Sequence, residues 1–405
     1  MGQRSPCPWT RSGGRSRQSW PERRRRRVRA LLREVALDGL SWAVRWVPES
    51  LPFVVQERIL VVQPDHLGDL LLATPALSAL RSSSPEAEIW AIVGPWASPI
   101  LTNNTDVDRV LEFPFPWFDR RADVPAHKRW LAAPALATRL RAFGFERAYL
   151  LRADHRWGAV AVALAGIPRR YGGPDARVDP FLTDPAPRPS GPHRTREALA
   201  IVGHRYEHAG SPPLRLSGSD ADRAHVKRIL RATGLERGCF VALHPGASRP
   251  VKRWPAERWA RVLDDVAEEW RVALLCGPGE QGLLDDIVRL CANAPALVNL
   301  GTIGAIGVLA ELIRAARAAI GLDSLAMHVA AAVDTPGVRL FGPTDEARFG
   351  PWGDPRRHRA LRAAGTRPDD AWFDAADTIH PSMLAIKADA VVAEMGRIFE
   401  ETGNR

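Results

Sequence analysis

The sequence predicts an α/β protein built from two Rossmann-like domains, each a doubly wound parallel sheet. Short apolar runs alternate with helical stretches from Arg58 onward, and this alternation occurs in two series. A stretch rich in Pro, Gly and Arg, residues 172–196, separates the two series. Because a chain of 405 residues exceeds the usual size of one domain, two domains with additional segments are expected.

The first series predicts a domain over residues 57–205. Its expected strands are 58–63, 88–93 and 147–151, and its expected helices are 69–81, 128–143 and 156–165. The runs assigned to strands are short and apolar, whereas the helical stretches are longer and mix apolar with polar residues. This order is typical of parallel strands that are linked and covered by helices.

The second series predicts a domain over residues 206–380, followed by a C-terminal segment, 381–405, with a helix over 381–400. Its expected strands are 239–244, 271–276, 296–299, 318–321 and 337–341, and its helices are expected after Pro255, Gly279, Gly304 and Ser324. In sheets of this kind a ligand binds in the crevice at the carboxyl ends of the strands. The loops at those ends are therefore the first places to look for a site.

The N-terminal segment, residues 1–56, carries most of the positive charge. The formal net charge is +10, and residues 1–30 hold ten arginines against the single acid Glu22. Because the rest of the chain is close to neutral, a nucleic-acid partner is not expected. Residues 1–21 are expected to be disordered. Residues 22–47 predict a basic amphipathic helix that binds an anionic membrane surface, with a solvated arm or an over-long reading frame as the alternative.

The cysteines and the apolar runs indicate a cytoplasmic protein that can be peripheral on the inner face of the membrane. Cys7, Cys239, Cys276 and Cys291 form no C-x-x-C pair and are expected to be reduced. No apolar run approaches the roughly 18 residues needed to span a bilayer. Charged residues interrupt the apolar part of the N-terminus, which is not typical of a signal peptide.

The first expected strand ends in a loop, residues 63–69, that leads into a helix. Gly68 allows the backbone to approach a ligand, and Asp69 lies at the helix start, where the helix dipole favours a carboxylate. An acid at this position often serves only as a helix cap. Its place at the carboxyl end of the first strand favours a functional role.

A second loop, residues 244–255, follows the first strand of the second domain. Gly246, Ser248 and Lys252, with two neighbouring arginines, supply free N–H groups, a hydroxyl and cations. These are the groups that bind a diphosphate. A solvated basic loop is the alternative.

A third loop follows the expected strand 318–321 and places Asp323 and Ser324 at a helix start. The exposed N–H groups of a first helical turn bind anions. Asp and Ser are also common helix caps, so a role limited to the helix stays open.

Two further patterns suggest a cofactor or a metal. Residues 277–282 match G-x-G-x-x-G after a strand, which is typical of nicotinamide binding, but Asn299 stands where the fingerprint requires an acid. The triplet 106–108 resembles a metal-binding Asp-x-Asp, but it precedes an ordinary strand. We therefore expect neither a cofactor nor a metal.

Three segments together resemble a known family. They are ILVVQPDHLGDLLLATPALSALR (59–81), HPGASRPVKRWP (244–255) and GLDSLAMHVAAAVDTPGVRLFGPTDEARFGPWG (321–353). In this order they are similar to glycosyltransferase family 9, the ADP-heptose:lipopolysaccharide heptosyltransferases, and the resemblance covers Arg58 to the C-terminus. It implies the GT-B fold and a metal-independent, inverting transfer of a sugar, heptose from ADP-heptose, to a lipopolysaccharide core or related glycolipid.

The resemblance also implies roles for individual residues. Asp69 matches the general base of the family's L-G-D motif. Gly68, Asp65 and His66 lie beside it on the acceptor side, and Asp65 is a rival base. Lys252 matches the lysine that contacts the donor phosphates. The other donor-binding residues that it implies are Gly246, Ser248, Glu280 on the donor ribose, Asp323, Ser324, Met327 and His328.

Two other functions stay open at this point. A nicotinamide-dependent oxidoreductase would use the Gly277–Gly282 segment, and tight binding of NAD in place of ADP would favour it. A non-catalytic sugar-nucleotide-binding protein would keep the donor site without transfer. The presence of Asp69 and Lys252 argues against this second alternative.

Overall fold

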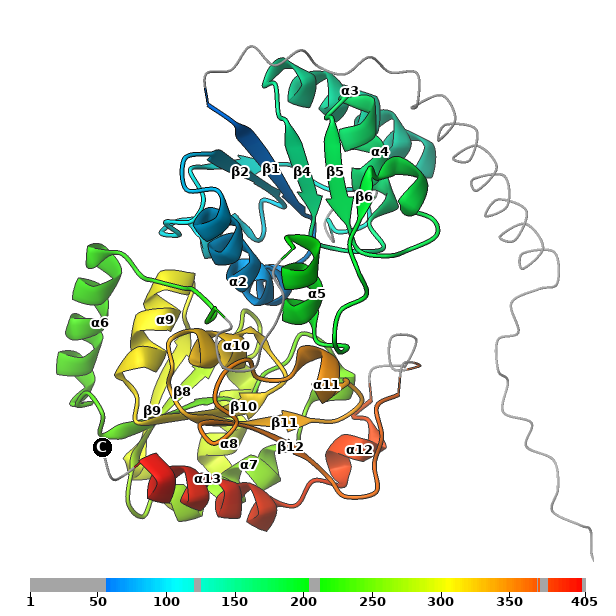
Figure 1. Cartoon of the computed structure of the whole chain (residues 1–405). Helices are drawn as coiled ribbons and strands as arrows, with labels where there is room; N and C mark the ends of the chain where they lie inside the picture. The colour runs from blue at the N-terminus through cyan, green and yellow to red at the C-terminus, as the bar shows by residue number, and fades with distance from the viewer. Residues whose placement is uncertain (1–55, 120–124, 204–211, 370, 372–377, 403–405) are drawn as a thin grey trace, which may run out of the picture. The chain divides into compact units, whose positions relative to one another are not determined.

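A computed structural model of the chain describes residues 56–119, 125–203, 212–369, 371 and 378–402 (Figure 1). The expected basic arm and amphipathic helix of residues 1–56 lie outside the described residues, apart from Gln56. Among the residues described, no helix is long and apolar enough to cross a membrane.

The first half of the described chain contains a six-stranded parallel sheet. Its strands are β1 (Arg58–Gln63), β2 (Glu88–Val93), β3 (Arg109–Glu112), β4 (Arg147–Leu150), β5 (Arg169–Gly172) and β6 (Asp184–Pro185). The strand order is β3-β2-β1-β4-β5-β6, and every neighbouring pair is parallel. The direction in which the chain adds strands therefore reverses between β1 and β4.

Helices cover both faces of this sheet (Figure 1). They are α2 (Leu67–Ser83), α3 (Ala126–Ala142), α4 (Arg156–Leu164) and α5 (Arg194–Ile201), with short 3-10 helices η1 (Ser98–Leu101) and η2 (Asp179–Phe181). Helix α2 packs against α5, and α3 packs against α4. Two helical layers thus enclose the strands, as the alternating sequence pattern predicts.

The second half contains another six-stranded parallel sheet. Its strands are β7 (Phe240–His244), β8 (Arg271–Cys276), β9 (Leu297–Thr302), β10 (Ala318–Leu322), β11 (Gly337–Phe341) and β12 (His358–Arg362). The order is β12-β11-β10-β7-β8-β9. Read from the β9 edge, this is the same arrangement as in the first sheet, and its reversal lies between β7 and β10.

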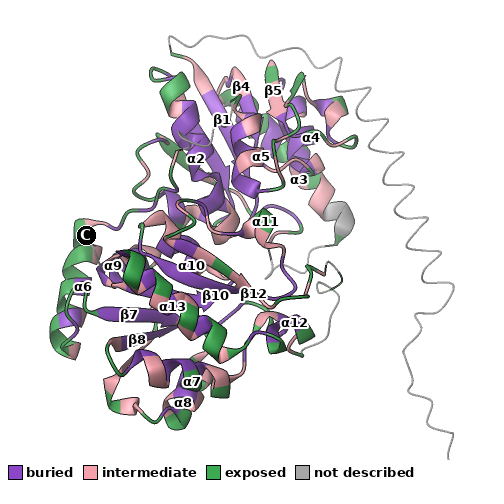
Figure 2. Ribbon diagram, turned by 60° about the horizontal axis from the view of Figure 1, so that its bottom comes forward, coloured by how far each residue is buried: buried purple, intermediate pink, exposed green. Residues whose placement is uncertain are grey.

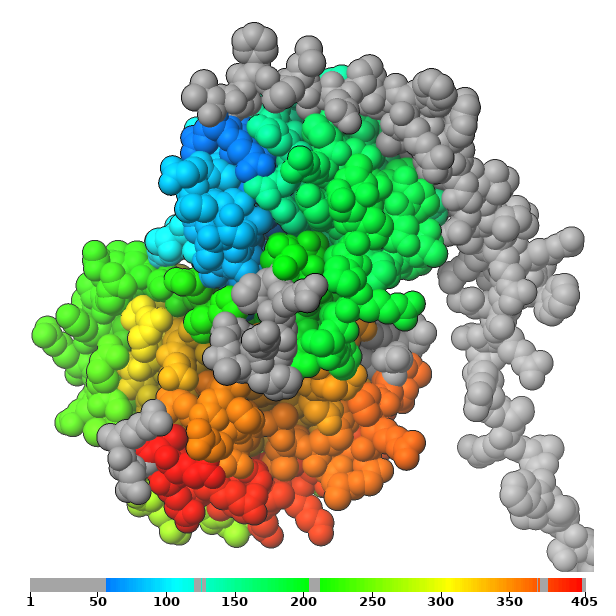
Figure 3. Space-filling model, in the orientation of Figure 1, coloured from blue at the N-terminus to red at the C-terminus, as the bar shows by residue number. Residues whose placement is uncertain are grey.

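The second sheet is also enclosed by two layers of helices. The helices of this half are α6 (Asp220–Thr233), α7 (Ala256–Val266), α8 (Gln281–Leu290), α9 (Ile306–Ala315), α10 (Leu325–Ala332), α11 (Glu346–Phe349), α12 (Pro381–Leu384) and α13 (Ala388–Thr402), with η3 (Pro250–Lys252) and η4 (Ala294–Ala296). Helix α7 packs against α8 and α13, whereas α9 packs against α6 and α10. Figure 3 shows α13 in red at the surface.

The central strands form because their residues are apolar on both faces. In β1 every residue from Ile59 to Gln63 is buried, and all five residues of β10 are buried (Figure 2). A parallel strand covered on both faces is expected to be such a continuous apolar run. The core also continues from one half to the other, because one cluster of buried side chains includes residues of both α2 and α10, which are in contact.

Several elements were not predicted from the sequence. Strand β6 has only two residues, β5 and β12 contain arginines and are half-exposed, and α5 begins inside the stretch 172–196 that reads as a linker. Helix α6 buries only Val226 and Leu230. Elements with so little buried apolar surface give a weak periodic signal. The expected domain boundaries at 57–205, 206–380 and 381–405 stay a prediction, and each sheet lies within one of these ranges.

The helix expected over 381–400 is divided into α12 and α13. Ile386 lies in the break, and its carbonyl oxygen accepts hydrogen bonds from Trp254 Nε1 at 3.3 Å and Arg258 Nη1 at 2.6 Å. Since this carbonyl is used by side chains of another segment, the continuous helical bonding pattern is interrupted here.

Candidate active site

The strand order of each sheet determines where a site can form. A reversal of strand order leaves a crevice at the carboxyl ends of the two strands that flank it. In the first sheet these ends are the loop after β1, residues 64–66, and the segment after β4, residues 151–155. In the second sheet they are residues 245–249 after β7 and residues 323–324 after β10. The loops selected from the sequence lie at these two places.

Asp69 lies in the first turn of α2 and is partly exposed. The helix begins at Leu67, two residues before its expected start, and its N-cap is His66, whose side chain makes no capping bond. Within the described residues the Asp69 carboxylate makes no hydrogen bond and no ion pair. The helix dipole stabilises a carboxylate here. Asp69 is therefore not a helix cap, and its oxygens are not committed to another side chain of the described chain.

Asp65 has a different environment from Asp69. It is 2% exposed, its carboxylate forms an ion pair with Arg152, and its Oδ2 lies 3.5 Å from Arg194 Nη2. Burial and the nearby Asp69 raise the pKa of Asp65 to about 6, although the two arginines oppose the shift. A carboxylate held between two guanidinium groups inside the protein is badly placed to take a proton from an incoming hydroxyl. Asp69 is thus the more accessible of the two carboxylates.

The two arginines around Asp65 were not predicted from the sequence. Arg152 also pairs with Asp154, its Nε lying 2.6 Å from Oδ1, and Arg194 Nη1 lies 2.7 Å from Glu197 Oε2. Arg152 directly follows the strand expected over 147–151, and this position at a strand end could have marked it as a residue near the site. Arg194 lies in the apparent linker and gave no signal. Because each arginine contacts two carboxylates, this cluster holds the loop after β1 in place.

His66 and Gly68 complete the loop. The ring of His66 lies 5.8 Å from that of Trp96, whose Nε1 donates to the carbonyl oxygen of Asp65 at 2.9 Å. A Cβ built on Gly68 would lie 3.3 Å from Cδ2 of His328 in α10. The start of α2 therefore approaches the start of α10 closely, and the two expected sites meet through Gly68 and His328.

Lys252 and Asp323 are brought together at the reversal of the second sheet. Lys252 Nζ donates to Asp323 Oδ2 at 2.7 Å, and both side chains are mostly buried. Burial would raise the pKa of Asp323, but the cations Lys252 and Arg339 lower it below its ordinary value. Asp323 is therefore an ionised residue that orients the lysine, and it does not cap α10.

Ser324 is the N-cap residue of α10, yet its side chain makes no capping hydrogen bond. Its Oγ is buried and has no hydrogen-bond partner within the described chain. A buried hydroxyl normally has a partner. The hydroxyl and the first N–H groups of α10 are thus a set of donors beside the Lys252 ammonium, which suits an anionic group.

Glu280 lies against the loop that follows β7. A Cβ built on Gly246 would stand 1.9 Å from Glu280 Oε2, so only glycine fits at position 246 without moving the glutamate. The same oxygen accepts a hydrogen bond from Gly277 N at 2.8 Å. Gly246 and Glu280, both expected to bind the donor, are therefore in contact. Ser248, in the same loop, is exposed.

Two predicted donor residues are buried. His328 is 6% exposed and contacts Arg339. Met327 is 4% exposed and packs under the glycines of β10 and β11, where a Cβ on Gly321 would come within 3.2 Å of its Cγ. Met327 thus belongs to the core, whereas His328 also reaches the start of α2.

The Asp-x-Asp triplet has a structural role. Asp106 accepts a hydrogen bond from Ser78 and lies 3.3 Å from Arg215 Nε, and Asp108 accepts from Ile89 N at 2.7 Å. In the part of the chain that the structure describes, no group of three or more His, Cys, Asp or Glu side chains is arranged to hold a metal ion.

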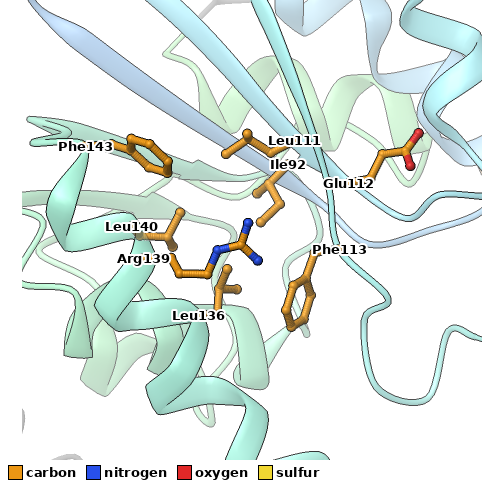
Figure 4. A pocket seen from close by; sticks show the side chains of 8 residues that line it. All are labelled: Ile92, Leu111, Glu112, Phe113, Leu136, Arg139, Leu140 and Phe143. Atoms are coloured by element: carbon orange, nitrogen blue, oxygen red, sulfur yellow. The ribbon is translucent and has the colours of Figure 1, made fainter.

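Two cavities are lined by other residues. One, between β3 and α3, has about 10 Å³ and is lined by Leu111, Leu140 and Phe143 together with Arg139 (Figure 4). It has room for about one water molecule. The other has about 810 Å³ and is lined by residues around His193 and Trp352. Helix α10 contributes Ala331 and Ala332 to the larger cavity. The residues expected to bind donor or acceptor do not line either cavity.

A comparison with known families assigns the chain. A profile described as Glycosyltransferase family 9 (heptosyltransferase) matches residues 135–370, which is more than half of the chain. The chain belongs to glycosyltransferase family 9. The resemblance noted in the sequence is thereby confirmed, and so is the assignment of the chain as a glycosyltransferase.

Individual relatives of this glycosyltransferase agree. It is 27% identical over 298 residues to lipopolysaccharide heptosyltransferase 3 of Escherichia coli (strain K12), covering 70% of this chain and 82% of the relative. It is 24% identical over 360 residues to lipopolysaccharide heptosyltransferase 2 of the same strain, covering 84% and 98%. The solved structure of E. coli ADP-heptose lps heptosyltransferase II matches with a TM-score of 0.66 at 21% identity, covering 85% and 99%. This last likeness confirms the GT-B fold.

Family membership favours the transferase over a nicotinamide-dependent oxidoreductase. The geometry of the Gly277–Gly282 segment agrees, because the N–H of Gly277 is already bound by Glu280. A dinucleotide fingerprint needs such amides for the pyrophosphate. In this glycosyltransferase the Gly277 N–H instead donates to the Glu280 carboxylate of the same segment.

Proposed function

We propose that this glycosyltransferase moves heptose from ADP-heptose onto a lipopolysaccharide core or a related glycolipid, with inversion at the anomeric carbon. The observation that carries the proposal is the pairing of Lys252 with Asp323 beside the unsatisfied hydroxyl of Ser324. The names of the relatives supply the sugar and the acceptor class, since they are lipopolysaccharide heptosyltransferases.

The donor half stabilises the leaving group. When the bond between heptose and ADP breaks, negative charge develops on the diphosphate. The Lys252 ammonium, the Ser324 hydroxyl and the N–H groups at the start of α10 lie in one place, so they stabilise this charge without reorganising. Glu280, held beside Gly246, binds the ribose hydroxyls of the donor.

Asp69 acts as the general base. The acceptor hydroxyl oxygen attacks the anomeric carbon while its proton passes to the Asp69 carboxylate, and ADP departs from the opposite side of the sugar. General base catalysis of this kind contributes a rate factor of about 10² to 10⁴. The transfer needs no metal in this scheme, because Lys252 supplies the countercharge that a divalent cation supplies elsewhere.

The test is the Asp69→Asn variant. We expect transfer from ADP-heptose to fall by at least the factor of about 10² that a general base contributes. ADP should raise the melting temperature of the variant as much as that of the unchanged protein, because the donor half is intact. Transfer is measured in the presence of EDTA, so that no free divalent metal ion contributes. Asp65→Asn is the control variant, because it removes the neighbouring carboxylate.

Two outcomes would contradict this scheme. If Asp69→Asn transfers heptose at the normal rate, Asp69 is not the base. If ADP and ADP-heptose leave the melting temperature unchanged while another nucleotide sugar raises it, the donor assignment is wrong. Binding without any transfer in the unchanged protein would support the non-catalytic alternative.

We propose that the protein works in the cytoplasm, peripherally on the inner face of the cytoplasmic membrane, where residues 22–47 contact anionic lipid. Six arginines between residues 23 and 29 support this, at about 1 kcal/mol for each cation near the surface. A chain lacking residues 1–47 should bind anionic vesicles more weakly but transfer heptose equally well to a soluble acceptor. Equal sedimentation of both chains with these vesicles would reject the contact.

A further inference from the structure

Helix α3 carries an uncharged, largely apolar stripe on its exposed side. The opposite side, which includes Leu136 and Leu140, is already buried. Leu131 is 69% exposed, the largest fraction among the exposed large apolar side chains of the described chain. It begins a row of exposed residues at helical spacing, which therefore lie along one side of the helix: Leu131, Pro134, Ala135, Thr138 and Ala142. Such a stripe is suited to contact with another apolar surface.

Arginines border this stripe on both sides. At about 3.6 residues per turn, Arg139 lies on one side of the stripe and Arg141 on the other. Arg139 is exposed and forms no ion pair with a described residue. Residues 126–142 include four Lys or Arg and no Asp or Glu. Apolar side chains bordered by cations are complementary to the interface of a bilayer that contains anionic phospholipids.

Trp117 extends this surface at the start of α3. It is 40% exposed, its ring lies 5.6 Å from that of Trp130, and the Arg129 guanidinium lies 5.6 Å above it. Its φ is 70°, in the left-handed region that a bulky side chain rarely adopts. Strain of this kind is concentrated at functional sites. Because tryptophan is enriched at membrane interfaces, an exposed ring held in this way suits the same bilayer surface.

The segment that carries Trp117 also reaches the acceptor loop. It follows β3, whose carboxyl end lies at the same edge of the sheet as that of β1. The Arg152 guanidinium lies 5.3 Å from the centre of the Phe118 ring, and Arg152 pairs with Asp65. A lipid surface beside Trp117 is therefore close to the loop at which the acceptor hydroxyl is expected.

We infer that Trp117 and the exposed stripe of α3 rest on the surface of a bilayer that contains anionic phospholipid. This α3 surface is a second membrane contact, in addition to the one proposed for residues 22–47. The inference rests on the proposed function, because that function gives the enzyme a glycolipid acceptor. The contact presents the acceptor loop to the headgroup layer, from which the sugars of a glycolipid extend.

The first experiment measures flotation of the full-length protein with vesicles of phosphatidylcholine and phosphatidylglycerol. Leu131→Glu places a carboxylate in the stripe. Leu290→Glu, at a leucine of α8 that is 45% exposed, is the control with the same change of charge. We expect Leu131→Glu to weaken vesicle binding about tenfold, because an apolar contact is lost and a negative charge faces anionic lipid. Leu290→Glu should bind the vesicles as the unchanged protein does.

Trp117→Gly tests the other part of the surface. Glycine adopts a φ of 70° without strain, so this variant removes the ring and keeps the backbone. It should also bind the vesicles more weakly, and it decides the question if Leu131→Glu does not fold. Unchanged vesicle binding by either folded variant would overturn the inference. An equal loss of binding in Leu290→Glu, or no binding by the unchanged protein, would overturn it as well.

The second experiment compares a glycolipid acceptor in the same vesicles with a soluble acceptor. For Leu131→Glu, the ratio of transfer to the vesicle-bound acceptor over transfer to the soluble one should fall about tenfold, through a higher KM for the vesicle-bound acceptor. Sedimentation velocity gives the size of each variant. A change from dimer to monomer in Leu131→Glu, with vesicle binding unchanged, would assign the stripe to a second copy of the chain and reject the membrane contact. If the unchanged protein transfers heptose to neither acceptor, the proposed function fails, whereas the flotation result still decides the inference.

Discussion

At the scale of single residues, the contact between Gly246 and Glu280 gives the sharpest test of the donor side. A Cβ at position 246 would overlap Glu280 Oε2, so Gly246→Ala must displace the glutamate. We expect ADP to bind about tenfold more weakly, as for one lost hydrogen bond to a charged group. Calorimetric titration with ADP measures this change.

The matched control for that variant is Gly282→Ala. A Cβ on Gly282 would meet nothing within 4 Å, and the residue lies in the first turn of α8. Alanine favours a helix over glycine, so the control should bind ADP normally and be slightly more stable. Equal ADP affinity in Gly246→Ala and Gly282→Ala would remove Glu280 from the donor site.

The candidate residues that can be selected from the sequence are those whose position alone suggests a role. Asp69, Lys252 and Asp323 each follow or adjoin a strand end, and this placement can be recognised without a structure. Arg339 could not be found in this way, because an arginine within an apolar strand indicates an edge or a solvent-facing position. The partners of Asp65 are distant in sequence, and only the folded chain shows which cations meet it.

At the scale of elements, helix α2 contains a proline, and a side chain of the same helix replaces the hydrogen bond that this proline cannot donate. Pro75 has no N–H, so the carbonyl oxygen of Leu71 lacks its helical donor. Thr74 Oγ1 donates to this carbonyl at 2.8 Å and accepts from Arg215 N at 2.9 Å. The buried Thr74 hydroxyl thus restores a hydrogen bond to the Leu71 carbonyl. It also joins α2 to the segment around Arg215, which leads to the second half.

We expect Thr74→Val to lower the free energy of unfolding by about 1 to 3 kcal/mol, since it leaves the buried Leu71 carbonyl and the partly buried Arg215 N–H without this partner. Thr138→Val in α3 is the control: Thr138 also donates to a carbonyl, that of Pro134, but it is exposed. Its effect should stay within about 0.5 kcal/mol. Chemical denaturation of both variants measures the difference, and similar values for the two would mean that the Thr74 hydroxyl does not carry this role.

Central elements were predicted closely and peripheral ones were not. The limits of β1, β2, β8 and β11 match the sequence expectations residue for residue, because apolar runs buried on both faces have clear ends. Helix α6 was missed, since a largely exposed helix is specified by its capping box at Ser219 and Asp222 more than by apolar periodicity. The loop of residues 244–255 could be located for the same reason as the strands, because it begins where an apolar run stops.

At the scale of the whole molecule, three buried histidines predict loss of stability in mild acid. Burial lowers the pKa of His155 to about 3 and of His193 to about 4, and burial with Arg339 holds that of His328 well below its ordinary value. The unfolded chain binds these protons near pH 6.5. The stability that these histidines contribute is therefore complete above about pH 6.5 and is lost as the pH falls through about 4 to about 3.

Asp65 acts in the opposite direction. Its pKa is raised to about 6, so its contribution is present below its ordinary pKa of 3.8 and is lost as the pH rises through 6. The proton that the folded protein binds at Asp65 thus offsets the effect of one of the three histidines on the pH dependence of stability. Urea unfolding at pH 7.5 and pH 4.5 should still give a lower midpoint in acid.

His155→Phe identifies the contribution of one histidine. Its ring nitrogens have no partner among the described residues, and it packs against Phe115, Phe118 and Trp157. Phenylalanine keeps this packing without a titrating group, so the stability lost between pH 7.5 and pH 4.5 should shrink by about 2 kcal/mol. An unchanged loss would show that His155 is charged or solvated in the folded protein.

The matching strand order of the two sheets bears on how the substrate selectivity of the enzyme can be changed. Most of the residues that we propose to bind donor and acceptor lie in short connections beyond β1, β7 and β10, whereas the strands form the apolar interior. Exchange of one such connection alters selectivity without disturbing the framework beneath it. Under the proposed function, nucleotide preference and acceptor preference are separable traits, and each varies within its own half.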